Sequence, residues 1–143
     1  QPRPGRHDAL ELLEDRGGGA VSVAHESIAI TDDGAKTGVV VVHLTRILDG
    51  GLDMSTHFAC ERGNAGWLAV ELDKALDAWG YPRTEARHGP DSFVIFGGGT
   101  DSNPIVNVRN TRPDDAPVSP GYSTLAMSHD STAALRDLLR GLS

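Results

Sequence analysis

The sequence contains one cysteine, no run of lysine or arginine and no long apolar segment, and each shortage excludes a class of protein. The single cysteine, Cys60, cannot form an internal disulfide, which excludes a small domain stapled by its own disulfides. The 20 Asp and Glu residues outnumber the 13 Lys and Arg residues, and the net charge of -7 comes with no basic stripe. Nucleic acid is therefore not an expected partner, and a basic partner fits the charge better.

The most apolar stretch, Val39–Leu48, is much shorter than the stretch of about 20 apolar residues that a membrane-spanning helix needs. No stretch has the pattern of a signal peptide. We therefore expect no membrane partner and a reducing, cytoplasmic location. Because the chain begins with Gln1, removal of an earlier segment stays an open alternative.

Recognised motifs for catalysis and ligand binding are also missing. The sequence has no Gly-x-Ser-x-Gly elbow and no histidine or cysteine spacing typical of a metal site. We therefore expect no catalytic residue, no cofactor and no metal. A chain of 143 residues can bury one core without a disulfide or a metal ion to stabilise it. Residues 1–143 are therefore predicted to form a single domain, with residues 1–6 as a flexible lead.

A β-hairpin is the clearest structural pattern in the chain. Val39–Leu48 is rich in β-branched residues, which favour strands, and Asp53–Cys60 alternates apolar and polar residues after a glycine turn. The apolar faces of the two strands match only if the turn has an odd number of residues. This register places His43 opposite His57 on the polar face.

Two helical segments are predicted after strands. The first covers residues 64–79 with Asn64 as its N-cap, and the second covers residues 129–142, where Ser128 or Asp130 can act as the cap. The rest of the chain supplies about six strands connected as hairpins. The sequence therefore predicts an α+β fold, in which the two helices pack on a mainly antiparallel sheet.

The facing histidines, His43 and His57, form the sharpest candidate site. Two imidazoles on one sheet face can bind a transition metal, carry a proton or line a ligand pocket. A metal site needs a third ligand, for which His25 and Asp53 are candidates that depend on the strand order. The alternative is a pair of half-exposed histidines without a function, which is common on sheet faces.

Two regions are candidate contacts for a partner protein. A glycine-rich segment is predicted to form a long hairpin loop, and its lack of a following helix argues against a phosphate site. Trp67 falls off the apolar stripe of its helix and is a candidate contact in a homodimer. The loop candidates are Gly97, Gly98, Gly99, Thr100 and Asp101.

Two further residues are predicted to be buried. Cys60 lies on the apolar face of its strand and is expected to act as a small hydrophobic residue and not as a nucleophile. Trp79 continues the apolar stripe of the first helix and is expected to close the core.

The sequence favours a non-enzymatic domain that binds another protein, as a regulator, inhibitor or assembly component. The acidic charge and the lack of a catalytic motif support this interpretation. The alternative is a small enzyme or ligand-binding protein with a polar pocket at His43 and His57. A pocket at that pair would favour the alternative, and a flat or sealed face would favour the protein binder.

Overall fold

The computed structural model describes residues 23–32, 37–51, 53–77, 82–116 and 119–142. The flexible lead predicted for residues 1–6 and the predicted burial of Trp79 lie outside these ranges.

Consecutive antiparallel pairings build two sheets. The three-stranded sheet has the order β1 (Val23–Asp32), β2 (Val39–Leu48) and β3 (Asp53–Glu61). The four-stranded sheet has the order β4 (Thr84–His88), β5 (Asp91–Thr100), β6 (Asn103–Arg112) and β7 (Gly121–Ser128). A short 3-10 helix, η1 (Arg62–Asn64), and α3 (Ala65–Leu76) connect the sheets, and α4 (His129–Arg140) follows β7.

The predicted α+β class, with antiparallel strands and two helices, is confirmed. The strands divide between two sheets instead of forming one. Both helices begin where the sequence predicts them, although α3 ends at Leu76 and α4 at Arg140, before the predicted ends at residues 79 and 142. α4 begins at His129, with the side chain of Ser128 accepting a hydrogen bond from Ser131 N. Ser128 is therefore the cap of α4.

The register of the central hairpin is the one that the apolar faces predict. His43 lies opposite His57, and Val42 lies opposite Phe58. Inward residues of β2 such as Val42 are buried, while His43 is only half-buried. In β3 only the second half enters the core, since Met54 is 37% exposed.

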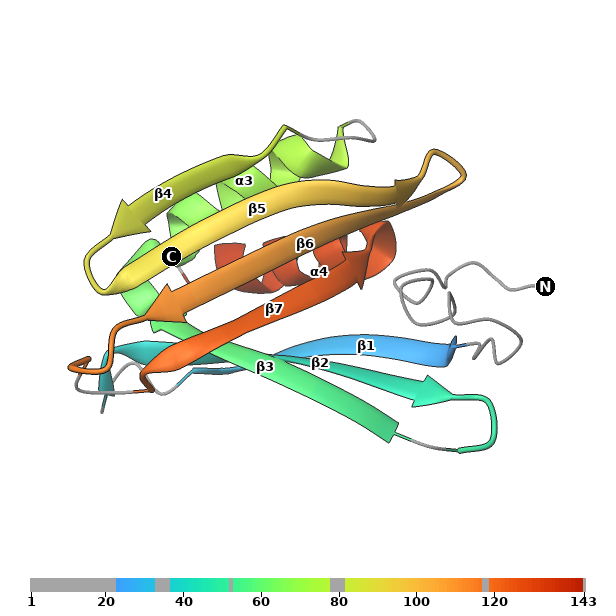
Figure 1. Cartoon of the computed structure of the whole chain (residues 1–143), viewed down its shortest axis with the longest axis horizontal. Coiled ribbons are helices and arrows are strands. Elements are labelled where there is room, and N and C mark those ends of the chain that lie inside the picture. The colour runs from blue at the N-terminus through green and yellow to red at the C-terminus, as the bar shows by residue number, and fades with distance from the viewer. Residues whose placement is uncertain (1–22, 33–36, 52, 78–81, 117–118, 143) are drawn as a thin grey trace.

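The helices fill the space on one side of the two sheets. Both lie behind the four-stranded sheet in Figure 1, and the three-stranded sheet crosses below it. α4 contacts β1, β6 and β7, α3 contacts α4, β5 and β6, and β3 contacts β7 where the two sheets meet. The core is apolar and includes Val40, Val42, Leu44, Leu68, Leu72, Ile95, Val108, Leu125, Leu135 and Leu139.

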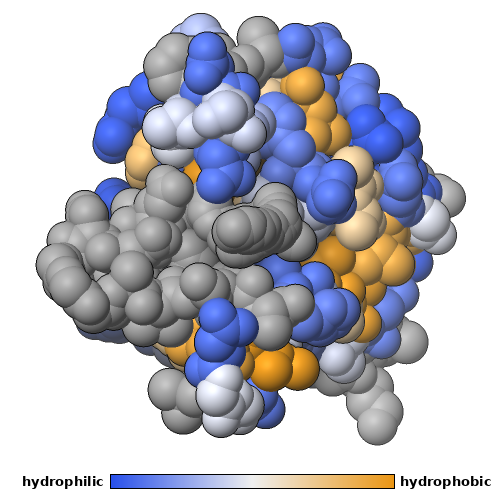
Figure 2. All heavy atoms as spheres, turned by 90° about the vertical axis from the view of Figure 1, so that its right-hand side faces the viewer, coloured by the Kyte–Doolittle hydropathy of each residue, from blue (hydrophilic) through white to orange (hydrophobic). Residues whose placement is uncertain are grey.

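The described residues at the end of the molecule that carries the β2–β3 and β5–β6 turns expose a mostly polar surface. Figure 2 shows this end, where separate hydrophobic patches lie among hydrophilic atoms. Within the described ranges, neither helix has the length and apolarity that a membrane crossing requires.

The glycine-rich segment is not the long loop that the sequence predicts. Gly97, Gly98 and Gly99 belong to β5 and pair with β6, and the turn contains only Asp101 and Ser102. Glycine keeps its backbone N–H and C=O groups, so a run of glycines can continue a ladder. Binding of a partner by Gly97–Asp101 stays a prediction.

Candidate functional site

The two histidines predicted to face each other do so across β2 and β3. Their ring centroids are 5.9 Å apart and the rings are tilted by 36°. His43 Nε2 lies 3.2 Å from Thr31 Oγ1, which fixes one side of the His43 ring from β1. The pair therefore has one imidazole held by the sheet and a second, His57, that is exposed.

The candidates for a third metal ligand lie elsewhere on the sheet. His25 and Asp53 both lie opposite Ile47, four residues along β2 from His43. At about 3.3 Å per residue this separation is too large for one ion to bridge. Among the described residues, no group of three His, Cys, Asp or Glu side chains is placed to hold a metal ion.

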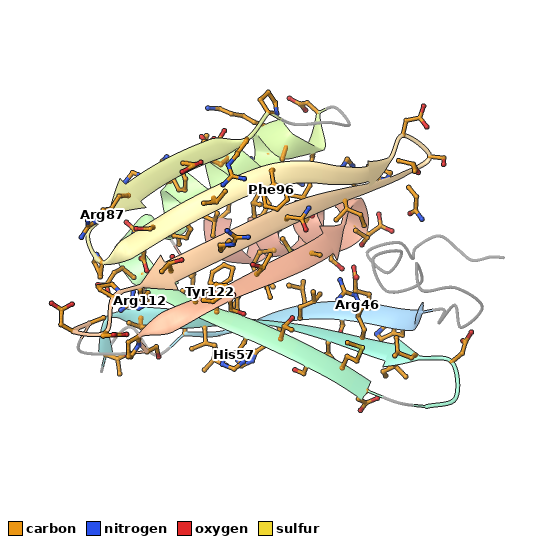
Figure 3. The ribbon with its side chains drawn as sticks, viewed as in Figure 1. Arg46, His57, Arg87, Phe96, Arg112 and Tyr122 are labelled. Carbon is orange, nitrogen blue, oxygen red and sulfur yellow. The ribbon has the colours of Figure 1, made fainter. Side chains whose placement is uncertain are left out.

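A recess of about 240 Å³ lies beside the histidine pair. Figure 3 shows His57 on β3, with Arg112 at the end of β6 and Tyr122 near the start of β7. The recess is lined by Val41, His43, His57, Phe58, Ala59, Asn110, Arg112, Ser119, Pro120, Gly121, Tyr122 and Ser123.

Strand alternation explains how two sheets form one recess. His43 and His57 point away from the helices, on the outer face of the three-stranded sheet. Asn110 and Arg112 share the inward row of β6 with Val108. The recess therefore lies between the outer face of one sheet and the inward row at the end of the other.

Arg112 is held by a buried polar network. Its guanidinium donates to Asp91 Oδ1 at 2.6 Å and to Glu61 Oε2 at 3.1 Å, and the residue is 3% exposed. Burial disfavours its charged form, but the hydrogen bonds and charges of Asp91 and Glu61 outweigh burial and raise the pKa of Arg112. The guanidinium at the recess is therefore charged and fixed in place.

Asp91 is the centre of this network. It is 0% exposed and also accepts hydrogen bonds from Glu61 N at 2.8 Å, Asn64 Nδ2 at 2.6 Å and Asn110 Nδ2 at 3.1 Å. Asn64 stands before α3 as predicted, but its side chain makes no cap hydrogen bond. It binds Asp91 instead, which ties the start of α3 to the four-stranded sheet.

A second network joins the three-stranded sheet to the start of α4. Arg46 Nε donates to Glu26 Oε2 at 3.0 Å, and a further Arg46 nitrogen donates to the carbonyl oxygen of Ala126. Glu26 Oε1 accepts from Ser128 Oγ at 2.7 Å and from Ser131 Oγ at 2.5 Å. Burial raises the pKa of Glu26, but these hydroxyl hydrogen bonds and the Arg46 charge outweigh it, so the net shift is downward.

The lowered pKa of Glu26 predicts a loss of stability in acid. The folded chain binds this proton less readily than the unfolded chain, so the stabilisation is present above the ordinary pKa of 4.5 and disappears as the pH falls through the folded-state value. At pH 7, Glu26→Gln should lower the free energy of unfolding by about 2 kcal/mol relative to the parent. Below pH 4.5 this difference in unfolding free energy should become smaller. Chemical denaturation of parent and variant at pH 7 and below pH 4.5 measures this difference, with Glu85→Gln at an exposed position as control. A difference in unfolding free energy that is the same at the two pH values would contradict the prediction.

Trp67 packs within its own chain more than the sequence predicts. Its ring centroid lies 4.5 Å from that of His88 and 5.2 Å from that of Phe93, and the residue is half-buried. Its role in a homodimer contact stays a prediction.

Cys60 is buried, as predicted. Burial, with a smaller contribution from Asp91, raises the pKa of the Cys60 thiol to about 12. The nucleophilic thiolate is therefore scarce at neutral pH.

Sequence reasoning named only His43 and His57 among the residues of the recess and missed its other polar residues, Asn110, Arg112, Ser119, Tyr122 and Ser123. Asn110 and Arg112 continue the inward row of Val106 and Val108. Because buried polar residues need hydrogen-bond partners, their positions in this row indicate a buried polar site. Ser119 has a φ of 52°, which is rare for a residue other than glycine.

Comparisons with known proteins do not assign a family. No protein-family model matches the chain, and a search of curated proteins gives no match. The recess and its surroundings are therefore the basis for a functional assignment, because function depends on the site and not on the fold class.

Proposed function

We propose that this chain is a protein-interaction domain, acting as a regulator, inhibitor or assembly component, and that Tyr122 and the recess are its contact. The exposure of Tyr122 carries the proposal. Tyr122 is 71% exposed and borders the recess, and it is the most exposed large apolar residue in the described part of the chain. Tyrosine combines a rigid apolar ring with a polar tip and is enriched at the centres of protein interfaces.

The size of the recess supports a protein partner. Pockets that enclose drug-sized ligands have volumes of about 300 to 1,000 Å³. The volume of about 240 Å³ is below that range and suits a single side chain. An exposed aromatic residue next to a recess of this size is the arrangement expected of an interface anchor.

The outer face of the four-stranded sheet extends this surface. Arg109 lies diagonally across from Tyr122 on that face, and its Nε donates to Thr124 Oγ1 at 3.3 Å. Figure 3 shows Phe96 and Tyr122 on the side of the sheet that faces away from the helices. Arg87 and Arg109 take part in none of the ion pairs formed between described residues. This face therefore suits acidic groups of a partner, although the net charge of the whole chain favours a basic one.

A small enzyme or ligand-binding protein is the second candidate function. The cavity beside His43 and His57 favours this candidate, because a sealed face would have offered no place for a small molecule. The two candidates differ in whether a protein or a small molecule is bound, which the following experiment separates.

The test of the proposal compares two surface variants of the full chain. Proteins captured from the native host by the immobilised chain are identified by mass spectrometry, and each candidate is then purified and titrated by calorimetry. Tyr122→Ala should weaken binding by at least about tenfold, because truncating a hot-spot residue of an interface typically costs about 2 kcal/mol or more. Val70→Ala on α3, where Val70 is 52% exposed, is the matched control and should bind like the parent. Equal loss in both variants, or no binding partner at all, would overturn the proposal.

A homodimer and a cytoplasmic location remain part of this proposal. Light scattering after size exclusion measures the mass of the full chain. A dimer that Tyr122→Ala dissociates would identify a second copy as the protein partner.

A further inference from the structure

We propose that β4 is a dimerisation edge, where two copies of this chain pair their β4 strands in antiparallel order around a two-fold axis at Ala86. β4 and β7 form the two edges of the four-stranded sheet. Figure 3 shows Arg87 on β4 and Tyr122 on β7, at these opposite edges. The dimer therefore uses a surface apart from the recess and leaves Tyr122 open to a partner protein, so this inference goes beyond the contact proposed above.

Among the described strands that end a sheet, β4 is the one open to further pairing. β3 and β7 contact each other where the two sheets meet. β1 contacts α4 and has an irregular register between Val23 and His25, and such an irregularity protects an edge. β4 pairs with β5 in a regular register and with no other described strand. An edge of this kind presents a row of N–H and C=O groups to another chain.

The turn after β4 indicates which of its backbone groups face the free edge. Gly89 and Pro90 form this turn, and it joins His88 to Asp91, which lie opposite each other. Hydrogen-bonded and non-hydrogen-bonded pairs alternate along an antiparallel ladder, and the pair that closes a two-residue turn is hydrogen-bonded. Every second residue back from His88 therefore bonds to β5. The N–H and C=O groups of the residues between them, at positions 85 and 87, point away from β5.

The charges of β4 complement themselves when Ala86 lies opposite Ala86 of the second copy. Glu85 then lies opposite Arg87 of the second copy, and these two residues exchange backbone hydrogen bonds through the groups that face the free edge. Their side chains share one face of the joined sheet, with Cβ atoms about 4.5 to 5.5 Å apart, which allows an ion pair. The two-fold axis repeats this pair. An axis at Glu85 or at Arg87 would instead place like charges opposite each other.

Prolines confine the paired stretch to the residues that this register uses. Pro82 and Pro90 are equally far from Ala86 in the sequence, and proline has no N–H group with which to extend a ladder. An axis at residue 84 would also oppose unlike charges, but it would leave Arg87 beyond Pro82 of the second copy. The axis at Ala86 pairs all 5 residues of β4.

The charged side chains of β4 are accessible to a second copy. Glu85 and Arg87 are both exposed. The Glu85 carboxylate accepts from Arg83 Nε at 2.8 Å, and because the side chain is 62% exposed, its oxygens can also accept from a second guanidinium. Arg87 Nε donates to Gly89 O at 3.4 Å, a long contact that a carboxylate can replace.

Aromatic packing holds β4 in place from the inner face of the sheet. The ring centroid of His88 lies 4.5 Å from that of Trp67 and 6.4 Å from that of Phe93. The edge is therefore ordered before a second copy arrives, which reduces the entropy lost on pairing. Trp67, the residue predicted to contact a second copy, supports the dimer edge from behind in this arrangement.

The test is sedimentation equilibrium of the full chain over a wide range of concentrations. A short strand edge buries little surface, so the parent should form a reversible dimer whose share rises with concentration. Glu85→Arg should weaken dimerisation by at least about tenfold, because both ion pairs become contacts between like charges. The double variant Glu85→Arg with Arg87→Glu restores both pairs and should dimerise like the parent. Mixing the single variants Glu85→Arg and Arg87→Glu should produce a dimer that neither forms alone.

Two control variants separate this inference from the proposed function. Asp114→Arg, at an exposed position between β6 and β7, makes the same change of net charge and should dimerise like the parent. Tyr122→Ala should also leave the dimer intact. A parent that stays monomeric at every concentration, a dimer that Glu85→Arg does not weaken, or a dimer that Tyr122→Ala dissociates would overturn the inference. If the charge exchange restores the dimer but no captured protein depends on Tyr122, the inference stands and the proposed contact at Tyr122 is wrong.

Discussion

Asp91→Ala is expected to lower the free energy of unfolding by about 3 to 5 kcal/mol, because it leaves the buried charge of Arg112 without its closest partner. The carboxylate is 0% exposed and accepts hydrogen bonds from η1, from β6 and from the backbone of Glu61. Each of these donors would lose a partner in a place that bulk water does not reach. Urea denaturation followed by circular dichroism measures the loss.

The exposed Asp101→Ala in the β5–β6 turn is the matched control and should change stability by no more than about 0.5 kcal/mol. A double variant, Asp91→Ala with Arg112→Met, should regain part of the loss, because it removes the unpaired charge together with its partner. A single variant as stable as the parent would show that the network contributes nothing to the fold.

Gly99→Ala should destabilise the chain by about 2 to 4 kcal/mol, because the backbone there is left-handed and the space for a Cβ is occupied. Gly99 has a φ of +74°, and an added Cβ would lie 2.4 Å from the carbonyl oxygen of Asn103 and 2.9 Å from Ile105 Cγ1. The obstacle is mainly backbone, so a side-chain rotation cannot relieve it. Thermal unfolding of parent and variant provides the measurement.

Gly63→Ala is the control for Gly99→Ala. Gly63 lies in η1 with open space around its Cβ position, and its φ is not positive. It should unfold close to the parent temperature. If Gly99→Ala also did so, the tight turn between β5 and β6 would have to tolerate a different geometry.

The hairpin register could be predicted because side chains alternate with a period of two. Val42 and Phe58 can both be buried only if the turn has an odd number of residues, and a turn of that length also places His43 opposite His57. The division into two sheets could not be predicted in this way. β3 pairs with β2 along one edge and contacts β7 across the sheet junction, and nothing in the alternation of β3 distinguishes this arrangement from a single sheet.

Only part of the two polar networks could be predicted from the sequence. Arg46 and Arg112 alternate with buried apolar residues along their strands, so the sequence indicates that both side chains point inward. Their partners did not, because they lie far away in the sequence: Arg46 binds Ala126, 80 positions on, and Arg112 binds Asp91, 21 positions back. The recess depends on such pairings, which explains why the histidines were found and Arg112 was not.

The glycine-rich segment shows where composition misleads. Glycine favours loops when only local preferences are considered, but Gly97–Gly99 continue β5 because β6 supplies hydrogen-bonding partners along their length. The requirement for glycine lies at Gly99, where φ is positive and the carbonyl oxygen of Asn103 occupies the Cβ position, while a Cβ on Gly98 would meet only the side-chain Nδ2 of Asn107, at 3.1 Å. Tertiary contact therefore overrode the local preference.

The pairings that join the two sheets also determine when the contact surface forms during folding. Asn110 Nδ2 donates to the carbonyl oxygen of Ala59 across 51 positions of sequence, and Ser131 Oγ donates to Glu26 across 105. Contacts of such long range close late, because the chain must first lose the entropy of the intervening loop. A nascent chain that ends before α4 lacks the hydrogen bond between Ser131 and Glu26, although the bond between Arg46 and Ala126 already joins β2 to β7. The surface that we assign to the partner contains no residue beyond Ser123, so its residues are complete before α4, which holds β1 against the end of β7, has been synthesised.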